Sequence, residues 1–102
     1  MFRYQLHVQV RAGQWREYYS GYEKLEQLSR AKNLVPSQLW GVSFGPINQA
    51  VIVADYETME AFDRDGKAFE SDPDIMKVWR GMAEHQEGIP WGELWESAHQ
   101  VA

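Results

Sequence analysis

Residues 2–10 alternate between apolar and polar side chains, and this alternation limits the folds open to the chain more than any other feature. The apolar positions are Tyr4, Leu6, Val8 and Val10. The polar positions between them are Arg3, Gln5, His7 and Gln9. A period of two residues is typical of a β-strand whose two faces meet different surroundings. The segment therefore predicts a strand in a sheet that packs against a core on one face only.

The next segment, residues 14–32, has the period of a helix. Apolar side chains recur at steps of three and four residues at Trp15, Tyr18, Tyr22, Leu25 and Leu28. Asn33 is a suitable residue for the end of a helix, and Pro36 prevents the helix from continuing. We therefore expect a helix with one apolar face.

Two strands with a turn between them follow. Residues 38–44 and 49–56 are rich in β-branched and aromatic side chains, and the sequence Gly-Pro-Ile-Asn at 45–48 separates them. Proline presets the backbone angle that the second position of a turn requires. The two runs predict a β-hairpin, and the nearly continuous apolar run 49–56 predicts a central strand.

A second helical pattern begins after Thr58, which is suited to cap it, and is interrupted at Pro73. Its apolar positions are Met59, Phe62, Gly66 and Phe69 before the proline, and Ile75, Val78, Trp79 and Met82 after it. Asp63 and Asp65 are interpreted as part of a solvated helix face. The breakers at 88–90, Gly-Ile-Pro, predict the end of this region, and residues 91–97 predict the last strand.

The order β-α-β-β-α-β indicates an α+β fold of the ferredoxin-like type in a single domain, residues 1–102. Such a fold has a four-stranded antiparallel sheet with helices on one face, and two helices leave the other face uncovered. That face, with Arg3, Gln5 and Gln9 and with Val51 and Val53, is half apolar and invites a partner. We expect a homodimer in which two sheets pack face to face as a dimeric α+β barrel. A monomer with one solvated sheet face is the alternative.

Composition excludes several classes of function. The 102 residues carry a net charge of −5 and no long run of lysine and arginine, so nucleic-acid binding is not expected. The absence of cysteine excludes disulfides, a thiolate nucleophile and cysteine-ligated metals. No apolar run is long enough for a membrane-spanning helix or a signal peptide. A cytoplasmic protein without membrane partners is therefore expected.

The hairpin resembles a segment of the NIPSNAP family. Residues 39–49, Leu-Trp-Gly-Val-Ser-Phe-Gly-Pro-Ile-Asn-Gln, are similar to that family's pattern Gly-x-x-x-Ser-x-Ile-Gly-Pro-Leu-Asn-Glu. The surroundings are similar too, with Gly13 before the first helix, Tyr56 near the end of a strand, and Asp72-Pro73 followed by Trp79. The resemblance covers roughly residues 4–80.

This resemblance implies a subunit of the dimeric α+β-barrel superfamily, with a cavity between sheet and helices. That superfamily includes antibiotic-biosynthesis and haem-degrading monooxygenases, muconolactone isomerases, polyketide cyclases and many proteins of unknown role. NIPSNAP-like first strands usually carry Glu-Leu-Arg, whereas this chain has Tyr-Gln-Leu at 4–6. Haem-degrading relatives use an asparagine on the first strand, which this strand lacks. Haem chemistry is therefore not expected, and no cofactor is predicted.

His7 and His85 are the candidate catalytic residues. A histidine side chain titrates near neutral pH and can act as a general acid or base. Structural roles stay open for both, His7 as a hydrogen-bonded residue of the dimer interface and His85 as a favourable charge at the end of a helix. Together with His99 these histidines are too dispersed for a metal site, so no metal is predicted.

Aromatic residues make up 14% of the chain and are the candidate lining of a ligand cavity. The candidates are Tyr4, Tyr22, Trp40, Tyr56, Trp79 and Trp95. Such side chains combine apolar area with a polar tip, and plain core packing is the alternative role. The expected function is binding of a small aromatic or hydrophobic molecule between sheet and helices. Two alternatives stay open, a cofactor-independent monooxygenase, isomerase or cyclase for aromatic polyketide-like substrates, and a structural or interaction dimer.

Overall fold

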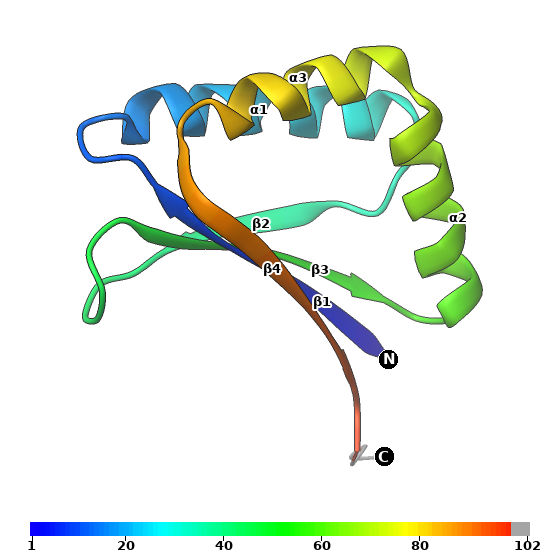
Figure 1. Cartoon of the computed structure of the whole chain (residues 1–102). Coiled ribbons are helices and arrows are strands. Elements are labelled where there is room, and N and C mark those ends of the chain that lie inside the picture. The colour runs from blue at the N-terminus through cyan, green and yellow to red at the C-terminus, as the bar shows by residue number, and fades with distance from the viewer. Residues whose placement is uncertain (99–102) are drawn as a thin grey trace.

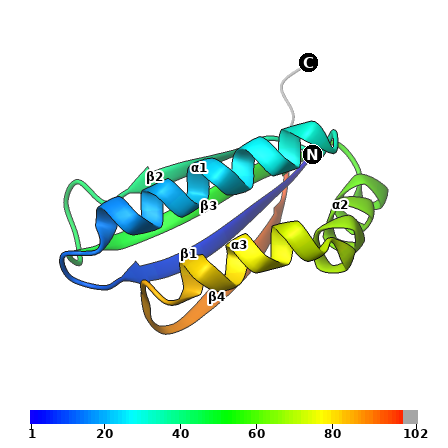
Figure 2. The same ribbon diagram turned by 90° about the horizontal axis from the view of Figure 1, so that it is seen from above.

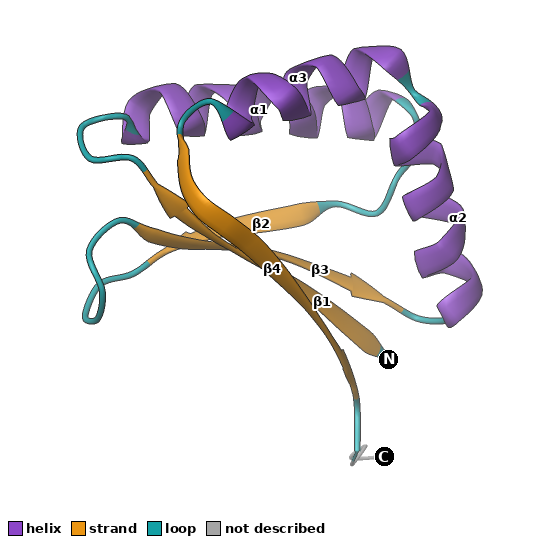
Figure 3. Ribbon diagram, viewed as in Figure 1, coloured by secondary structure: helices purple, strands orange, loops and turns teal. Residues whose placement is uncertain are grey.

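The structure of the chain, a computed structural model, describes residues 1–98. The elements follow in the order β1 (Phe2–Val10), α1 (Trp15–Ala31), β2 (Ser37–Gly41), β3 (Gln49–Tyr56), α2 (Met59–Ser71), α3 (Pro73–Ala83) and β4 (Gln86–Glu96). The strands form one antiparallel sheet in the order β2-β3-β1-β4. Helices and strands form two layers, with all helices on one side of the sheet (Figure 3). The predicted ferredoxin-like α+β fold is confirmed.

Strand register explains the alternation of β1. Residues that pair directly in an antiparallel sheet place their side chains on the same face. Val8 pairs with Ala50 of β3, and both are buried beneath the helices. His7, one residue earlier, pairs with Val51 on the other face. The expected side of the sheet for Val51 is therefore confirmed, because Val51 lies on the uncovered face together with the polar residues of β1. We call this uncovered side the open face.

The helix layer covers the sheet unevenly. α1 and α3 lie side by side above the strands, and α2 stands at one end, between the helix layer and the end of β3 (Figures 1 and 2). The core between the layers is formed by Val8, Val10, Tyr18, Tyr22, Leu25, Ala50, Ile52, Ile75 and Met82. No helix among residues 1–98 has the length and apolar character that crossing a membrane requires. The pocket described below lies at the end of the core where α2 stands, between the sheet, α1 and α2.

Two local signals define the break between α2 and α3. Thr58 Oγ1 accepts a hydrogen bond from the Ala61 backbone N–H at 3.1 Å and caps α2. Asp72 Oδ1 accepts from the backbone N–H groups of Asp74 and Ile75 at 2.9 and 3.0 Å, and Pro73 is the first residue of α3. Proline is preorganised for that position, since a first-turn N–H has no partner inside the helix. The expected break at Pro73 is confirmed, and it lets the chain turn the corner that α2 makes.

The strand β4 begins at Gln86, earlier than the predicted start at residue 91. His7 pairs with Trp91 and Gln9 with Glu87, so residues 88–90 lie opposite Val8 alone and form a bulge. Gly88 has a φ of 68°, which glycine adopts without strain. β4 is an edge strand, where a proline such as Pro90 is tolerated. The breakers therefore mark a bulge inside the strand and not its beginning.

The strand β2 ends at Gly41, earlier than the predicted end at residue 44. Residues 42–48 form the connection to β3, and Asn48 has a φ of 64°. Phe44 and Ile47 are 97% and 80% exposed there. A connection that carries such apolar side chains has the same residue types as a strand. The sequence therefore predicts a β2 that continues past Gly41 to residue 44.

Substituting Gly21 by alanine is expected to destabilise the fold. A Cβ at Gly21 of α1 would lie 2.7 Å from Cγ of Met82 on α3, and Met82 is 1% exposed. Overpacking costs about 1–3 kcal/mol and outweighs the gain of about 1 kcal/mol in helix propensity. Gly81→Ala is the matched control, because a Cβ there meets nothing within 4 Å and only the gain remains. Urea unfolding measures both; equal stability of the two variants would contradict this close helix contact.

Candidate functional site

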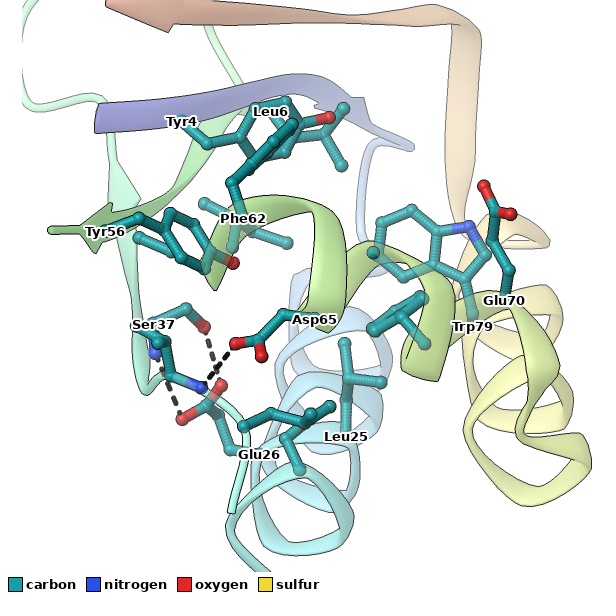
Figure 4. A pocket seen from close by; sticks show the side chains of 17 residues that line it. Tyr4, Leu6, Leu25, Glu26, Ser37, Tyr56, Phe62, Asp65, Glu70 and Trp79 are labelled. Carbon is teal, nitrogen blue, oxygen red and sulfur yellow. Dashed lines mark hydrogen bonds between the residues drawn. The ribbon is translucent and has the colours of Figure 1, made fainter. Parts of the chain in front are cut away.

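A pocket of about 330 Å³ lies in the wedge between the sheet, α1 and α2. Its floor comes from β1 and β3, and its walls come from the C-terminal half of α1, the α1–β2 connection with the first residue of β2, α2 and one residue of α3. Figure 4 shows these side chains converging from the sheet and the helices. Small-molecule sites are typically concave, mostly apolar and of about 300–1,000 Å³, so the pocket is at the lower end of that range.

Aromatic side chains form the apolar part of the pocket. Phe62 of α2 packs between Tyr4 of β1 and Tyr56 of β3, with ring centroids 5.6 and 5.4 Å apart. Trp79 of α3 meets Phe69 of α2 edge to face, with centroids 5.5 Å apart. Edge-to-face rings are a favourable aromatic geometry. The rings therefore support one another and present fixed apolar surfaces to the pocket.

Asp65 of α2 brings a carboxylate into the pocket. The residue is 4% exposed, and its Oδ2 accepts a hydrogen bond from the Val35 backbone N–H at 2.7 Å. Its Oδ1 accepts from Arg64 Nε at 3.2 Å. Figure 4 shows the Asp65 carboxyl group and the Tyr56 hydroxyl pointing toward the same part of the pocket. A carboxylate and a phenol therefore stand together where the pocket is polar.

Glu26 of α1 adds a second buried carboxylate, and the residue is 9% exposed. Ser37 Oγ donates to Glu26 Oε1 at 2.6 Å, and the Ser37 backbone N–H donates to Oε2 at 3.4 Å. The Tyr22 hydroxyl lies 2.7 Å from Ser37 Oγ and extends the network. These bonds fix the start of β2 against α1, as Asp65 fixes Val35. Both carboxylates therefore hold the chain that leads into β2 as well as lining the pocket.

The pocket lining has an excess of negative charge. It contains three carboxylates, those of Glu26, Asp65 and Glu70, and no lysine, arginine or histidine. Arg30 and Arg64 approach the first two carboxylates from outside, and their side chains are 73% and 66% exposed. Exposed charges are screened by solvent and contribute little. The interior of the pocket therefore offers carboxylates without an enclosed cation.

Tyr56 is expected to make stability fall at high pH. Burial, followed by the negative charge of Asp65, raises the pKa of Tyr56 from 10.0 to about 12. The folded state holds the phenol proton more tightly than the unfolded state does. The contribution of Tyr56 to the free energy of unfolding is therefore complete below pH 10 and is lost as pH rises toward about 12. The measurement is urea unfolding of the wild type and of Tyr56→Phe across this range, with the exposed Tyr19→Phe as control. A wild-type minus Tyr56→Phe difference that stays constant to pH 12 would show that the phenol is not shielded.

The cavity residues predicted from the sequence fall into two groups. Tyr4, Tyr56 and Trp79 line the pocket. Tyr22 is buried beside it and reaches the polar end through Ser37 without lining it. Trp40 and Trp95 lie on the open face, where Trp40 pairs with Val51 and Trp95 with Arg3. These two tryptophans therefore point away from the pocket.

The two candidate catalytic histidines are not brought together. His7 lies on the open face, with Nε2 2.9 Å from Glu93 Oε1 and its ring stacked on Trp91. His85 follows α3, and its Nδ1 lies 2.8 Å from Gln14 Oε1 at the start of α1. Neither histidine lines the pocket. His99 lies outside the described residues. Among residues 1–98, no three histidine or acidic side chains come together as metal ligands.

The open face combines exposed tryptophans with polar pairs. Trp40, Trp91 and Trp95 are 57%, 50% and 57% exposed. Arg3 makes two hydrogen bonds to Asp55, at 2.8 and 3.0 Å. The other residues expected on this face are Gln5, which pairs with Val53 and Glu93, and Gln9, which donates to the Ile47 carbonyl at 2.7 Å. The face therefore carries the polar row of β1 between rows in which apolar side chains alternate with polar and acidic ones.

The interpretation of Asp65 as a solvated residue is wrong, because the residue is buried. The signal lies in the helical period. Asp65 stands three residues after Phe62 and four before Phe69, so it belongs to the same stripe. Glu26 likewise stands four residues after Tyr22 and was not singled out. A carboxylate within an apolar stripe is the pattern that could have indicated both.

The class of protein that this arrangement defines is a ferredoxin-like α+β domain with a pocket between its sheet and its helices. No model of a protein family and no curated protein matches the sequence. Solved structures do match, among them an uncharacterised NIPSNAP domain protein from Burkholderia xenovorans at 16% identity and a TM-score of 0.82, covering 100% of this chain and 99% of that one. A NIPSNAP family protein of unknown function from Agrobacterium tumefaciens has 15% identity and a TM-score of 0.81, covering 99% and 91%.

A structure described as an antibiotic biosynthesis monooxygenase is also similar, with 13% identity and a TM-score of 0.76, covering 97% of this chain and 100% of that one. At such identities the likeness establishes the fold alone. The resemblance of the hairpin to NIPSNAP sequences is therefore matched by structural neighbours that carry this name. The chemistry of the site has to be argued from the residues of this chain.

Proposed function

We propose that this chain binds a small, largely aromatic or hydrophobic molecule in the pocket between sheet and helices. One observation carries the proposal: aromatic side chains from β1, β3, α2 and α3 converge on a pocket that also holds the buried polar groups of Asp65 and Glu26. Apolar walls supply affinity through removal of surface from water, and a few placed polar groups supply orientation. Binding is preferred to catalysis because His7 and His85 lie outside the pocket.

The open face supports a second part of the proposal, pairing with another copy of this chain. One row across the sheet runs Trp40, Val51, His7 and Trp91. Three half-exposed tryptophans on one face are a larger apolar area than a monomer usually leaves in water. A second identical sheet offers the same mixture of apolar and polar rows, which suits a two-fold interface. The pocket lies on the other side of the sheet, so each copy has its own binding site.

Binding can be tested with a neutral aromatic probe, para-fluorophenethyl alcohol, observed by fluorine NMR. We expect its signal to broaden on addition of the protein and to recover when an excess of the unfluorinated alcohol is added. Competition shows that the site is saturable. A signal that stays unchanged at up to about 1 mM protein would mean that the binding free energy is weaker than about −4 kcal/mol. That result would contradict the proposal.

A further inference from the structure

We propose that the pocket selects ligands that carry a protonated amine on an aromatic or alicyclic body. The ring lies against Tyr4, Phe62 and Trp79, and the ammonium group lies at the end formed by Asp65 and Glu26. This inference rests on the proposed function, since it names the chemical class of the molecule that the pocket binds.

The distribution of charge is the first reason. The Asp65 and Glu26 side chains are 5% and 12% exposed, so their charges act inside the pocket with little screening. Their arginine neighbours lie outside and are largely solvated. No cationic side chain lines the pocket. An ammonium ion can therefore pair with opposite charges in the pocket. A carboxylate or phosphate would lose its hydration there without gaining a cationic partner, which is unfavourable.

Free acceptor capacity is the second reason. Each carboxylate oxygen has two lone pairs. Oδ2 of Asp65 uses one on the Val35 N–H, and Oε1 of Glu26 uses one on the Ser37 hydroxyl. Both of these donors are neutral, while the largely solvated Arg64 donates to the other Asp65 oxygen, Oδ1, at 3.2 Å. A ligand N–H can bond to the remaining lone pairs, and such charge-assisted bonds are stronger than neutral ones.

The pKa of Tyr56 is affected by burial and by the negative charge at this end of the pocket. The pKa of its hydroxyl is raised by burial, then by the charge of Asp65, with a smaller effect from Glu26. Burial disfavours a charge of either sign, whereas the negative charge of Asp65 that adds to the Tyr56 pKa is of the sign that favours a cation at the same place. The Tyr56 hydroxyl makes no hydrogen bond to residues 1–98 that would occupy it. The aromatic faces add to the preference, because a ring attracts a cation over its face.

Three matched probes test the inference: para-fluorophenethylamine, para-fluorophenethyl alcohol and para-fluorophenylacetate. They share the ring and differ in charge. We expect the amine to bind at least about tenfold more tightly than the acid, with the alcohol between them. Asp65→Asn keeps an oxygen for the Val35 N–H and is expected to bring the amine close to the alcohol. Asp63→Asn is the matched control on the same helix, because Asp63 is exposed and does not line the pocket.

The outcomes separate this inference from the proposed function. If the amine, alcohol and acid bind equally, or if Asp63→Asn and Asp65→Asn have the same effect, the charge selection is wrong while binding of an apolar molecule stands. If none of the three probes binds, the pocket is not a site for molecules of this kind and both proposals fail. A preference for the amine that Asp65→Asn alone removes supports both.

Discussion

Substituting Gly66 by leucine is expected to lower the affinity of the pocket for para-fluorophenethyl alcohol by about 100-fold or more, since filling an apolar pocket removes the area that drives binding. Gly66 lies on α2 among the lining residues, and a Cβ there meets nothing within 4 Å. It shares the helical stripe of the lining residues Phe62 and Phe69, so we expect a leucine side chain at this position to reach into the pocket. The fold is expected to survive, because glycine inside a helix is less favourable than leucine by about 1 kcal/mol.

The control for this substitution is Gly81→Leu on α3, where a Cβ also has open space but does not line the pocket. It shares the gain in helix propensity and leaves the binding space unchanged. Ala54→Leu provides a second, independent obstruction from the sheet, because Ala54 is a buried lining residue. Fluorine NMR titration measures all three variants. If Gly66→Leu and Ala54→Leu both bind the alcohol as tightly as Gly81→Leu, the molecule binds elsewhere.

Substituting Val53 by glutamate is expected to convert a dimer into a monomer. Val53 lies on the open face between Gln5 of β1 and Gln38 of β2. A two-fold interface would bury the new carboxylate twice, and an unpaired buried charge costs several kcal/mol each time. Sedimentation is then expected to give the mass of one copy, 11.9 kDa, for the variant and twice that mass for the wild type.

Ser20→Glu is the control for this experiment, because it adds the same charge to an exposed position on α1 away from the open face. The Val53→Glu monomer is expected to keep its affinity for the alcohol, since the pocket lies on the opposite side of the sheet. A wild-type protein that sediments as a single copy at micromolar concentration would contradict the proposed pairing. Loss of probe binding in the folded monomer would show that the two sides of the sheet are coupled.

Much of the fold follows from local patterns. The alternation of β1, the hairpin around residues 45–48 and the break at Pro73 each depend on neighbouring residues, and all three agree with the structure. The start of β4 does not, because Gly88 and Pro90 resemble a strand boundary unless the partner strand is known. A bulge is a property of a pair of strands, so one strand's sequence does not reveal it.

The site was predictable only in part for the same reason. Trp40 and Trp95 were assigned to the cavity because an aromatic residue in a strand does not reveal which face it occupies. A shift of register by one residue moves a side chain to the other face. Asp65 was missed because its charge was given more weight than its place in the stripe of Phe62 and Phe69. Its burial depends on the Val35 N–H, which comes from a distant part of the chain.

The tryptophans provide the most direct measurement of the central claim, that the pocket between sheet and helices is the binding site. Trp79 lines the pocket, whereas Trp40, Trp91 and Trp95 lie on the open face. Each indole N–H gives its own signal in a heteronuclear NMR spectrum, assigned by substituting one tryptophan at a time. On titration with para-fluorophenethyl alcohol, the Trp79 signal is expected to move while the open-face signals stay in place. Movement of the open-face signals with an unchanged Trp79 would contradict the account.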